Sequence, residues 1–221
     1  MAACLLYYIT DRTQFPGDER TRRLALLAKI AEAAHAGVDY IQLREKDLSV
    51  CELEILAREA AAAIRENIPA SNHQSPATRL VINSRTDIAL AVGADGVHLR
   101  SNDISPSAVR SVWSLCGAGT PARERPVITV SVHTKADILR AESDGADFAV
   151  FAPVFEKKDA APAGLDALRE ACQAKIPIFA LGGVTIENAV ACLDAGAAGI
   201  AAIRLFQENK IEKVVRVLRK R

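Results

Sequence analysis

The sequence is poor in several features that would indicate a particular class of protein. Aromatic residues make up 5% of its 221 residues, with a single tryptophan and a single methionine. The 28 basic and 27 acidic residues nearly cancel, so no basic stripe indicates nucleic acid and no acidic tail is present. A charged ligand would therefore have to be held by local groups and not by the field of the whole molecule.

Cysteine pairs and long apolar runs are also lacking. The five cysteines are scattered, odd in number and free of CxxC spacing: Cys4, Cys51, Cys116, Cys172 and Cys192. This usage argues against a disulfide framework and a zinc site and favours the cytoplasm. No apolar stretch approaches the roughly 20 residues of a membrane helix. The N-terminal run MAACLLYYITD lacks preceding basic residues and is too short for a signal peptide, so we expect a strand there.

What the sequence does have is alternation. Half of its residues are hydrophobic, and short apolar runs alternate with alanine-rich stretches of helical spacing. The candidate strands are residues 5–10, 39–44, 79–84, 96–99, 127–132, 148–154, 176–183 and 199–203. Strands that alternate with helices predict a parallel sheet. Continuously apolar strands agree, because a parallel sheet is covered on both faces.

One helix-to-strand joint recurs four times, as AGVDYIQLR, VGADGVHLR, DGADFAVFA and AGAAGIAAI. We expect its glycine to adopt the left-handed conformation where a helix ends. Four copies spread through the chain predict a closed (β/α)₈ TIM barrel that forms a single domain over residues 1–221. An open doubly wound sheet is the alternative, but no GxGxxG motif follows the first strand.

In such a barrel the active site is built at the carboxyl ends of the strands and in the loops that follow them. Polar residues gather at those positions: Gln42, Arg44, Lys46, Asn83, Asp103, Ser131, His133, Lys158 and Arg204. Lysine and arginine neutralise phosphate oxygens, while a carboxylate can hold a Mg²⁺ ion that bridges them. The mixture predicts a site for a polyanion together with a divalent cation.

Spacing adds detail to two of these groups. Gln42 and Arg44 are two residues apart, so both point to one face of a strand and converge on the pocket if that face is the barrel interior. Ordinary strand-end charges in water are the alternative. Likewise, His133 shares a face with Ser131, where it is either an acid–base group or a structural histidine.

Gly182 and Gly183 precede a helix and predict a second feature, an anion nest of backbone N–H groups. Barrels repeatedly bind phosphate in the loops after strands 7 and 8, which is where this pair falls. A tight turn without a ligand is the alternative.

Together, YYITD, GVDYIQLREKD, NSRTDIALAVGADGVHL, VSVHT, GADFAVFAPVF, IPIFALGG and AGAAGIAAI resemble, in order, thiamine phosphate synthase and its TenI-like relatives over nearly the whole chain. The resemblance implies an enzyme that joins 4-amino-2-methyl-5-pyrimidinylmethyl pyrophosphate to a thiazole phosphate and releases pyrophosphate, with Mg²⁺. It implies two phosphorylated small molecules as partners, with neither nucleic acid nor membrane. A homo-oligomer is compatible with the sequence, which does not define the oligomeric state.

The resemblance also implies roles for single residues. Gln42, Arg44, Lys46 and Asn83 would contact the pyrimidine pyrophosphate, and Asp103 would hold Mg²⁺. Ser131 would lie over the pyrophosphate, Lys158 would bind its oxygens, and Gly183 would offer a backbone N–H to the thiazole phosphate.

Four departures from the family pattern keep alternatives open. The NDR aspartate, a second Mg²⁺ ligand in the family, is replaced by Ser84, and a glycine of HLGQED is replaced by Arg100. The threonine-bearing PTxTK loop is shortened to EKK, and a serine is replaced by Arg204. One carboxylate holds Mg²⁺ less firmly than two, while added arginines could neutralise phosphate directly. Ser84 and the SVH segment at His133 fit a thiazole tautomerase of the TenI type, and a non-catalytic barrel that binds a thiamine precursor is the third hypothesis.

Overall fold

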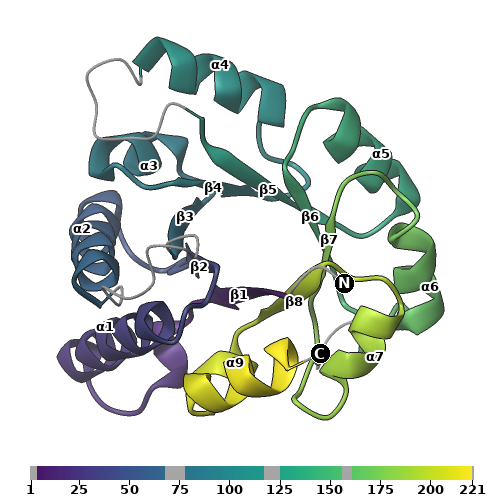
Figure 1. Cartoon of the computed structure of the whole chain (residues 1–221). Helices are drawn as coiled ribbons and strands as arrows, with labels where there is room; N and C mark the ends of the chain where they lie inside the picture. Colours follow the sequence, from purple (N-terminus) through teal and green to yellow (C-terminus); the bar gives the residue numbers. More distant parts are fainter. Residues whose placement is uncertain (1–3, 68–77, 117–124, 156–160, 221) are drawn as a thin grey trace.

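A computed structural model describes residues 4–67, 78–116, 125–155 and 161–220. Eight parallel strands close into a barrel in which each pairs with its neighbours in the sequence and β1 pairs with β8 (Figure 1). They are β1 (Leu5–Ile9), β2 (Tyr40–Leu43), β3 (Arg79–Asn83), β4 (Gly96–Leu99), β5 (Val127–Val132), β6 (Phe148–Phe151), β7 (Ile178–Ala180) and β8 (Gly199–Ala202). The predicted TIM barrel and its eight predicted strands are confirmed.

Helices surround the barrel and connect its strands (Figure 1). They are η1 (Arg12–Gln14), α1 (Glu19–His35), α2 (Val50–Asn67), α3 (Thr86–Val92), α4 (Pro106–Cys116), α5 (Lys135–Ser143), α6 (Gly164–Ala171), α7 (Ala189–Asp194), α8 (Arg204–Gln207) and α9 (Ile211–Arg219). Over the described ranges, none of these is both long and apolar enough to cross a membrane.

The recurrent joint behaves as predicted. Its four glycines, at positions 37, 93, 145 and 196, all have φ between 67° and 106°, the region that residues with a Cβ rarely adopt. In three copies an aspartate follows, and its Oδ2 accepts a hydrogen bond of 2.7 to 2.8 Å from a backbone N–H of the preceding strand: Asp39 from Leu6, Asp95 from Leu80 and Asp147 from Ile128. The joint therefore both ends a helix and fixes the start of a strand.

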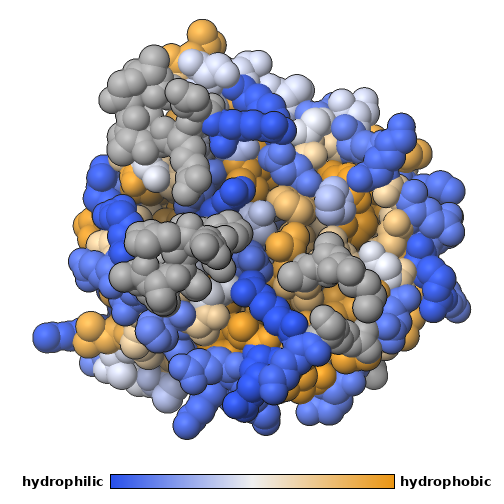
Figure 2. All heavy atoms as spheres, viewed as in Figure 1, coloured by the Kyte–Doolittle hydropathy of each residue, from blue (hydrophilic) through white to orange (hydrophobic). Residues whose placement is uncertain are grey.

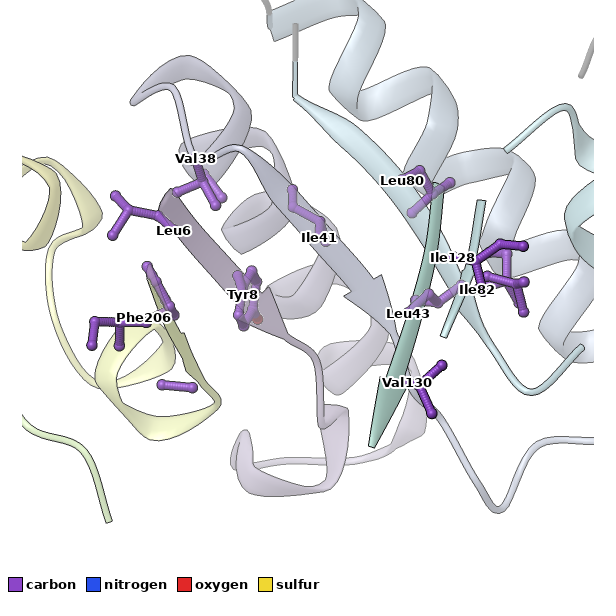
Figure 3. Packing of buried hydrophobic residues seen from close by; sticks show 14 of the residues in the cluster. Leu6, Tyr8, Val38, Ile41, Leu43, Leu80, Ile82, Ile128, Val130 and Phe206 are labelled. Carbon is purple, nitrogen blue, oxygen red and sulfur yellow. The ribbon is translucent and has the colours of Figure 1, made fainter. Parts of the chain in front are cut away.

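The two faces of the strands have different partners. Alternate strand residues point outward and pack beneath the helices. Figure 3 shows the cluster that they form with Val38, before β2, and Phe206, on α8: Leu6, Tyr8, Ile41, Leu43, Leu80, Ile82, Ile128 and Val130. On the outer surface hydrophilic residues predominate around the rim, with hydrophobic residues visible between them (Figure 2). This layering covers both faces of the parallel sheet, as continuously apolar strands require.

Inside the barrel, composition changes along the axis. Tyr7, Tyr40, Phe148 and Phe179 form an aromatic layer with neighbouring ring centroids 5.2 to 6.0 Å apart. Tyr40 and Phe148 open their strands, so this layer fills the amino end. Toward the carboxyl ends the inward positions become polar. Polar partners for a ligand inside the barrel therefore lie toward the carboxyl ends, whereas Arg79, Arg125 and Asp147 line a separate cavity at the amino end.

Candidate active site

A column of hydrogen bonds rises through the barrel interior. The Tyr7 hydroxyl lies 3.0 Å from Thr129 Oγ1, which lies 2.7 Å from His98 Nδ1. On the other side of the imidazole, Nε2 lies 2.8 Å from Ser131 Oγ. Tyr7 and Thr129 are fully buried and His98 is 5% exposed, so the column links the sealed core to Ser131 at the end of β5.

The protons of this column can be assigned by counting partners. Burial lowers the pKa of His98 from its ordinary 6.5 to about 3, and the charge of Arg44 adds to the shift, so the ring is neutral. Among the described residues Thr129 is the hydrogen-bond partner of the Tyr7 hydroxyl, so Tyr7 must donate to Thr129 for its buried proton to be used. Thr129 then donates to His98 Nδ1, and Nε2–H donates to Ser131. The Ser131 hydroxyl proton remains available to an acceptor at the mouth.

A second network crosses the mouth from β2 to the loop after β4. Gln42 Nε2 donates to Asn83 Oδ1 at 2.9 Å, and Asn83 Nδ2 lies 3.3 Å from Ser84 Oγ. Ser84 Oγ donates in turn to Asp103 Oδ2 at 2.6 Å. Gln42 Oε1 is buried and has no partner among the described residues, although its residue is only 1% exposed. A buried acceptor left open in this way suits a ligand N–H donor.

Asp103 ends this network as a paired, ionised carboxylate. Arg100 contacts it through Nη2 and Nε, at 2.8 and 3.1 Å from Oδ1. Burial acts to raise the pKa of Asp103, but hydrogen bonds from Arg100 and Ser84 and the charge of Arg100 outweigh it and leave the pKa below its ordinary value. A cavity of about 30 Å³ beside the pair is lined in part by Arg100, Asp103 and Ser131. The two networks therefore meet at one place.

The backbone at Ser84 is unusual. Its φ of 58° lies in the left-handed region, and it is the one described residue other than glycine with a positive φ. Its amide donates to the His98 carbonyl at 2.7 Å, which holds this conformation at the end of β3. Strained backbone of this kind concentrates at functional sites, because the surrounding structure must be built to hold it.

A buried ionic cluster lies beneath the loop that carries Arg44 and Lys46. Glu45 accepts hydrogen bonds from the Thr10 hydroxyl at 2.6 Å, the Arg12 amide at 3.0 Å and Arg12 Nη1 at 3.2 Å. Thr10 Oγ1 also accepts from the Arg44 amide at 2.9 Å. Burial raises the pKa of Glu45 against the opposing effect of these hydrogen bonds. The cluster fixes the main chain on both sides of Glu45, and so the origin of both cationic side chains.

The loop after β7 is built around a close approach. At Gly182, φ is 101°, and a Cβ would lie 2.7 Å from Cα and Cβ of Pro153. Gly183 has φ of 64°. Among the described residues, the carbonyl oxygen of each glycine accepts a hydrogen bond, and the amide of neither glycine donates one. The pair precedes α7, and a turn separates the two because α7 begins at Ala189.

Three predicted residues are placed apart from this centre or are not described. Strand β5 ends at Val132, so the alternation that puts Ser131 and His133 on one face does not extend to His133. His133 is exposed, its Nδ1 lies 2.7 Å from the Ala152 carbonyl, and it lines a cavity of about 360 Å³ with residues of α5 and α6. Arg204 is exposed at the start of α8. Lys158 lies outside the described residues.

From the sequence, His98, Arg12 and Glu45 were expected at strand ends but were given no role in the site, and Thr129 was missed. The available signal was register: the pairs Asn83–His98 and His98–Thr129 are adjacent in neighbouring strands. A histidine and a threonine that share the inward row with Asn83 and Ser131 belong to the same polar layer. The buried cluster offered no comparable signal, because Arg12 and Glu45 read as ordinary loop charges.

The chain is similar to known proteins of one family. Residues 6–206 match the family described as thiamine monophosphate synthase. A putative thiamine-phosphate synthase of Geobacter sulfurreducens is 40% identical over 203 residues, covering 90% of this chain and 84% of the relative. The thiamine-phosphate synthase of Syntrophomonas wolfei is 35% identical over 221 residues, covering 97% and 94%. The structure of thiamine phosphate pyrophosphorylase from Pyrococcus furiosus is similar with a TM-score of 0.76 at 29% identity, covering 98% of this chain and 94% of that one.

This closed (β/α)₈ barrel belongs to the thiamine monophosphate synthase family. The predicted family is thereby confirmed, and with it, at the level of the family, the predicted thiamine-phosphate synthase function and its transferase class.

Proposed function

We propose that this chain couples 4-amino-2-methyl-5-pyrimidinylmethyl pyrophosphate to a thiazole phosphate, within a single barrel domain. The bond between the methylene carbon and pyrophosphate oxygen breaks, and its electron pair leaves with the pyrophosphate. The thiazole nitrogen then donates its lone pair to the methylene carbon and forms the new C–N bond. The observation that carries this proposal is the polar mouth, where an open buried amide acceptor lies next to cationic strand-end residues.

The pyrimidine end would be read by Gln42 and Asn83. The open Gln42 Oε1 can accept a hydrogen bond from the exocyclic amine of an aminopyrimidine. Asn83 already holds the Gln42 amide group in position through its 2.9 Å hydrogen bond. A fixed acceptor discriminates against rings without the amine, because a buried polar group would then stay unpaired.

The leaving pyrophosphate would be held by Arg44, Lys46 and Ser131. Arg44 and Lys46 follow β2 on a main chain that is fixed through Thr10 and Glu45. Because Ser131 Oγ accepts a hydrogen bond from His98 Nε2–H, its own proton can be donated towards the mouth. Fixed cations and donors of this kind stabilise charge that develops as pyrophosphate leaves.

The thiazole phosphate would lie at the loop after β7, with the amides of Gly182 and Gly183 as donors. The close contact of Gly182 with Pro153 supports this placement, because it holds the loop against the segment that follows β6. Holding both substrates in line supplies a further part of the rate enhancement.

Magnesium is the cofactor that the resemblance implies, with Asp103 as its ligand. The donor set does not fit it, because the resemblance implies a second carboxylate at the position of Ser84, whose hydroxyl instead donates a hydrogen bond to Asp103. Both Asp103 oxygens are already engaged by Arg100 and Ser84. We therefore assign the steps above to side chains and backbone alone.

Neither alternative function gains a specific observation. A thiazole tautomerase would need His133 at the reacting carbon, but His133 lies over the groove between α5 and α6. A non-catalytic barrel predicts binding without turnover. We propose a cytoplasmic location with small-molecule partners, and we expect no nucleic acid.

The test is to incubate the purified chain with both substrates, with and without Mg²⁺, and to measure pyrophosphate release and thiamine phosphate. Formation of both in equal amounts supports the proposal. Isomerisation of the thiazole carboxylate phosphate that depends on His133 would instead support the tautomerase. Saturable binding with neither reaction would support the non-catalytic barrel.

A further inference from the structure

The carboxylate of Asp103 is saturated by donors from its own chain. Oδ1 accepts from Arg100 Nη2 and Nε, at 2.8 and 3.1 Å. Oδ2 accepts from Ser84 Oγ at 2.6 Å and from the Arg100 amide at 2.8 Å. Each oxygen thus has two donors, which use the lone pairs that a metal ion would need.

The loop itself enforces this pairing. The Asp103 amide donates back to the Arg100 carbonyl at 3.1 Å, so residues 100–103 form a closed turn. Within the turn the Arg100 backbone and side chain both reach one carboxylate. The Asp103 side chain is 12% exposed, whereas the Arg100 side chain is 58% exposed and faces solvent beside the cavity shared with Ser131.

This arrangement changes the charge that an incoming ligand meets. A cation approaching Asp103 encounters a guanidinium first, and the pair beneath it is neutral. An anion encounters that guanidinium directly. Arg100 Nη1 has no partner among the described residues, so its two N–H groups can bind an anion while Nε and Nη2 hold Asp103.

Ser84 completes the change, because it brings no charge of its own. Its hydroxyl proton is already donated to Asp103, and its strained backbone holds that hydroxyl in place. After β4 the Arg100–Asp103 pair therefore presents an exposed guanidinium above a covered carboxylate.

We infer that Arg100 takes the place of a divalent cation at this site, so that the chain binds pyrophosphate without Mg²⁺. The inference rests on the proposed function, from which the pyrophosphate ligand is taken. It changes the cofactor requirement of that function, because the guanidinium supplies the positive charge at the pyrophosphate.

The experiment is calorimetric titration of the full chain with inorganic pyrophosphate, once in EDTA and once in excess free Mg²⁺. We expect binding in EDTA, with a Kd that Mg²⁺ changes by less than about threefold. Binding that requires Mg²⁺, or that Mg²⁺ strengthens by about tenfold or more, would overturn the inference.

Three variants separate the roles of the pair. Arg100→Gln should weaken binding in EDTA by about tenfold or more, since a charge-assisted hydrogen bond is lost. Asp103→Asn should leave binding in EDTA as tight or tighter, because it frees Arg100. The control is Arg169→Gln: Arg169 is 57% exposed and pairs with Asp166 at the same i,i+3 spacing on α6. It should bind as the unmodified chain does.

The same variants give the opposing outcomes. If Asp103 were a metal ligand, Asp103→Asn would abolish a Mg²⁺-dependent part of the binding, and Arg100→Gln would leave binding in EDTA unchanged. Circular dichroism and thermal melts identify a variant that fails to fold, in which case the titration of the unmodified chain still decides. No binding of pyrophosphate under either condition would also refute the inference.

Failure of the two proposals can be distinguished. Thiamine phosphate formation that occurs only with Mg²⁺ keeps the proposed function and removes this inference. Pyrophosphate binding in EDTA without any product, under all conditions, keeps the inference as a statement about an anion site and removes the proposed function.

Discussion

Replacement of Glu45 by alanine tests the buried cluster that supports the cationic loop. Thr10 and Arg12 would lose their shared acceptor in a site where Glu45 is 5% and Arg12 is 3% exposed. Removing one partner of a buried ion pair costs about 3–5 kcal/mol, because the other charge stays desolvated. Arg12 keeps its two contacts with Asp47, at 2.7 and 2.8 Å, so we expect the lower end, about 3 kcal/mol.

The chain offers a matched control on the same arginine. Glu19 accepts from Arg12 Nε at 2.7 Å, but its side chain is 57% exposed. An exposed pair contributes about 0–1 kcal/mol, since solvent screens it. Glu19→Ala should therefore cost much less than Glu45→Ala, although both remove a carboxylate from Arg12.

Two measurements check this prediction. Urea-induced unfolding should show the difference in the free energy of unfolding between the two variants. Titration with pyrophosphate should show weaker binding for Glu45→Ala by about tenfold, since the main chain at Arg44 and Lys46 is no longer fixed, and little change for Glu19→Ala. Equal costs for the two variants, or unchanged pyrophosphate binding by a folded Glu45→Ala protein, would refute the reasoning.

Four other predictions concern the two networks and the phosphate loops. Thr129→Val should remove the acceptor of Tyr7 and release the Nε2–H tautomer of His98, which ¹⁵N NMR of the imidazole detects; an unchanged tautomer would contradict the assigned direction. Because the folded chain keeps His98 neutral down to about pH 3 whereas the unfolded chain binds a proton below 6.5, stability is complete above pH 6.5 and falls on acidification. Between pH 6 and 4 the free energy of unfolding of the unmodified chain should change with pH more steeply than that of His98→Gln, by up to about 1.4 kcal/mol per pH unit. Urea unfolding at each pH measures this difference. Lys46→Ala should weaken pyrophosphate binding strongly, with Lys213→Ala on α9 as the control, and equal binding would remove Lys46 from the anion site. Gly182→Ala should lower the melting temperature more than Gly164→Ala, because both have positive φ but only the former meets Pro153.

The barrel was predictable because its signals are local and repeated. Each strand is a short apolar run, and each glycine of the recurrent joint marks a helix end, so neither depends on distant contacts. The aspartates at positions 39, 95 and 147 follow the same joint, yet their hydrogen bonds to the preceding strand require the barrel to be closed. That role depends on a neighbour distant in the sequence.

The site was predictable in its residues more than in their geometry. Gln42 and Asn83 were expected from strand ends and lie within hydrogen-bonding distance. His133 was expected beside Ser131, but the strand stops one residue too soon for the alternation to hold. The hydrogen bonds that occupy both Asp103 oxygens depend on the turn at residues 100–103 and on the left-handed backbone of Ser84. Neither feature follows from the two-residue period of a strand or the 3.6-residue period of a helix.

The hydrogen-bonded column from Tyr7 to Ser131 restricts which substitutions these positions can accept during evolution. Its proton order is set at the sealed end of the barrel and used at the open end, so substitutions at positions 7, 98, 129 and 131 are not independent. A relative without a threonine at position 129 needs another hydrogen-bond donor to His98 Nδ1. Without one, the orientation of the Ser131 hydroxyl is lost. We expect these four positions, drawn from β1, β4 and β5, to covary among relatives as a single unit.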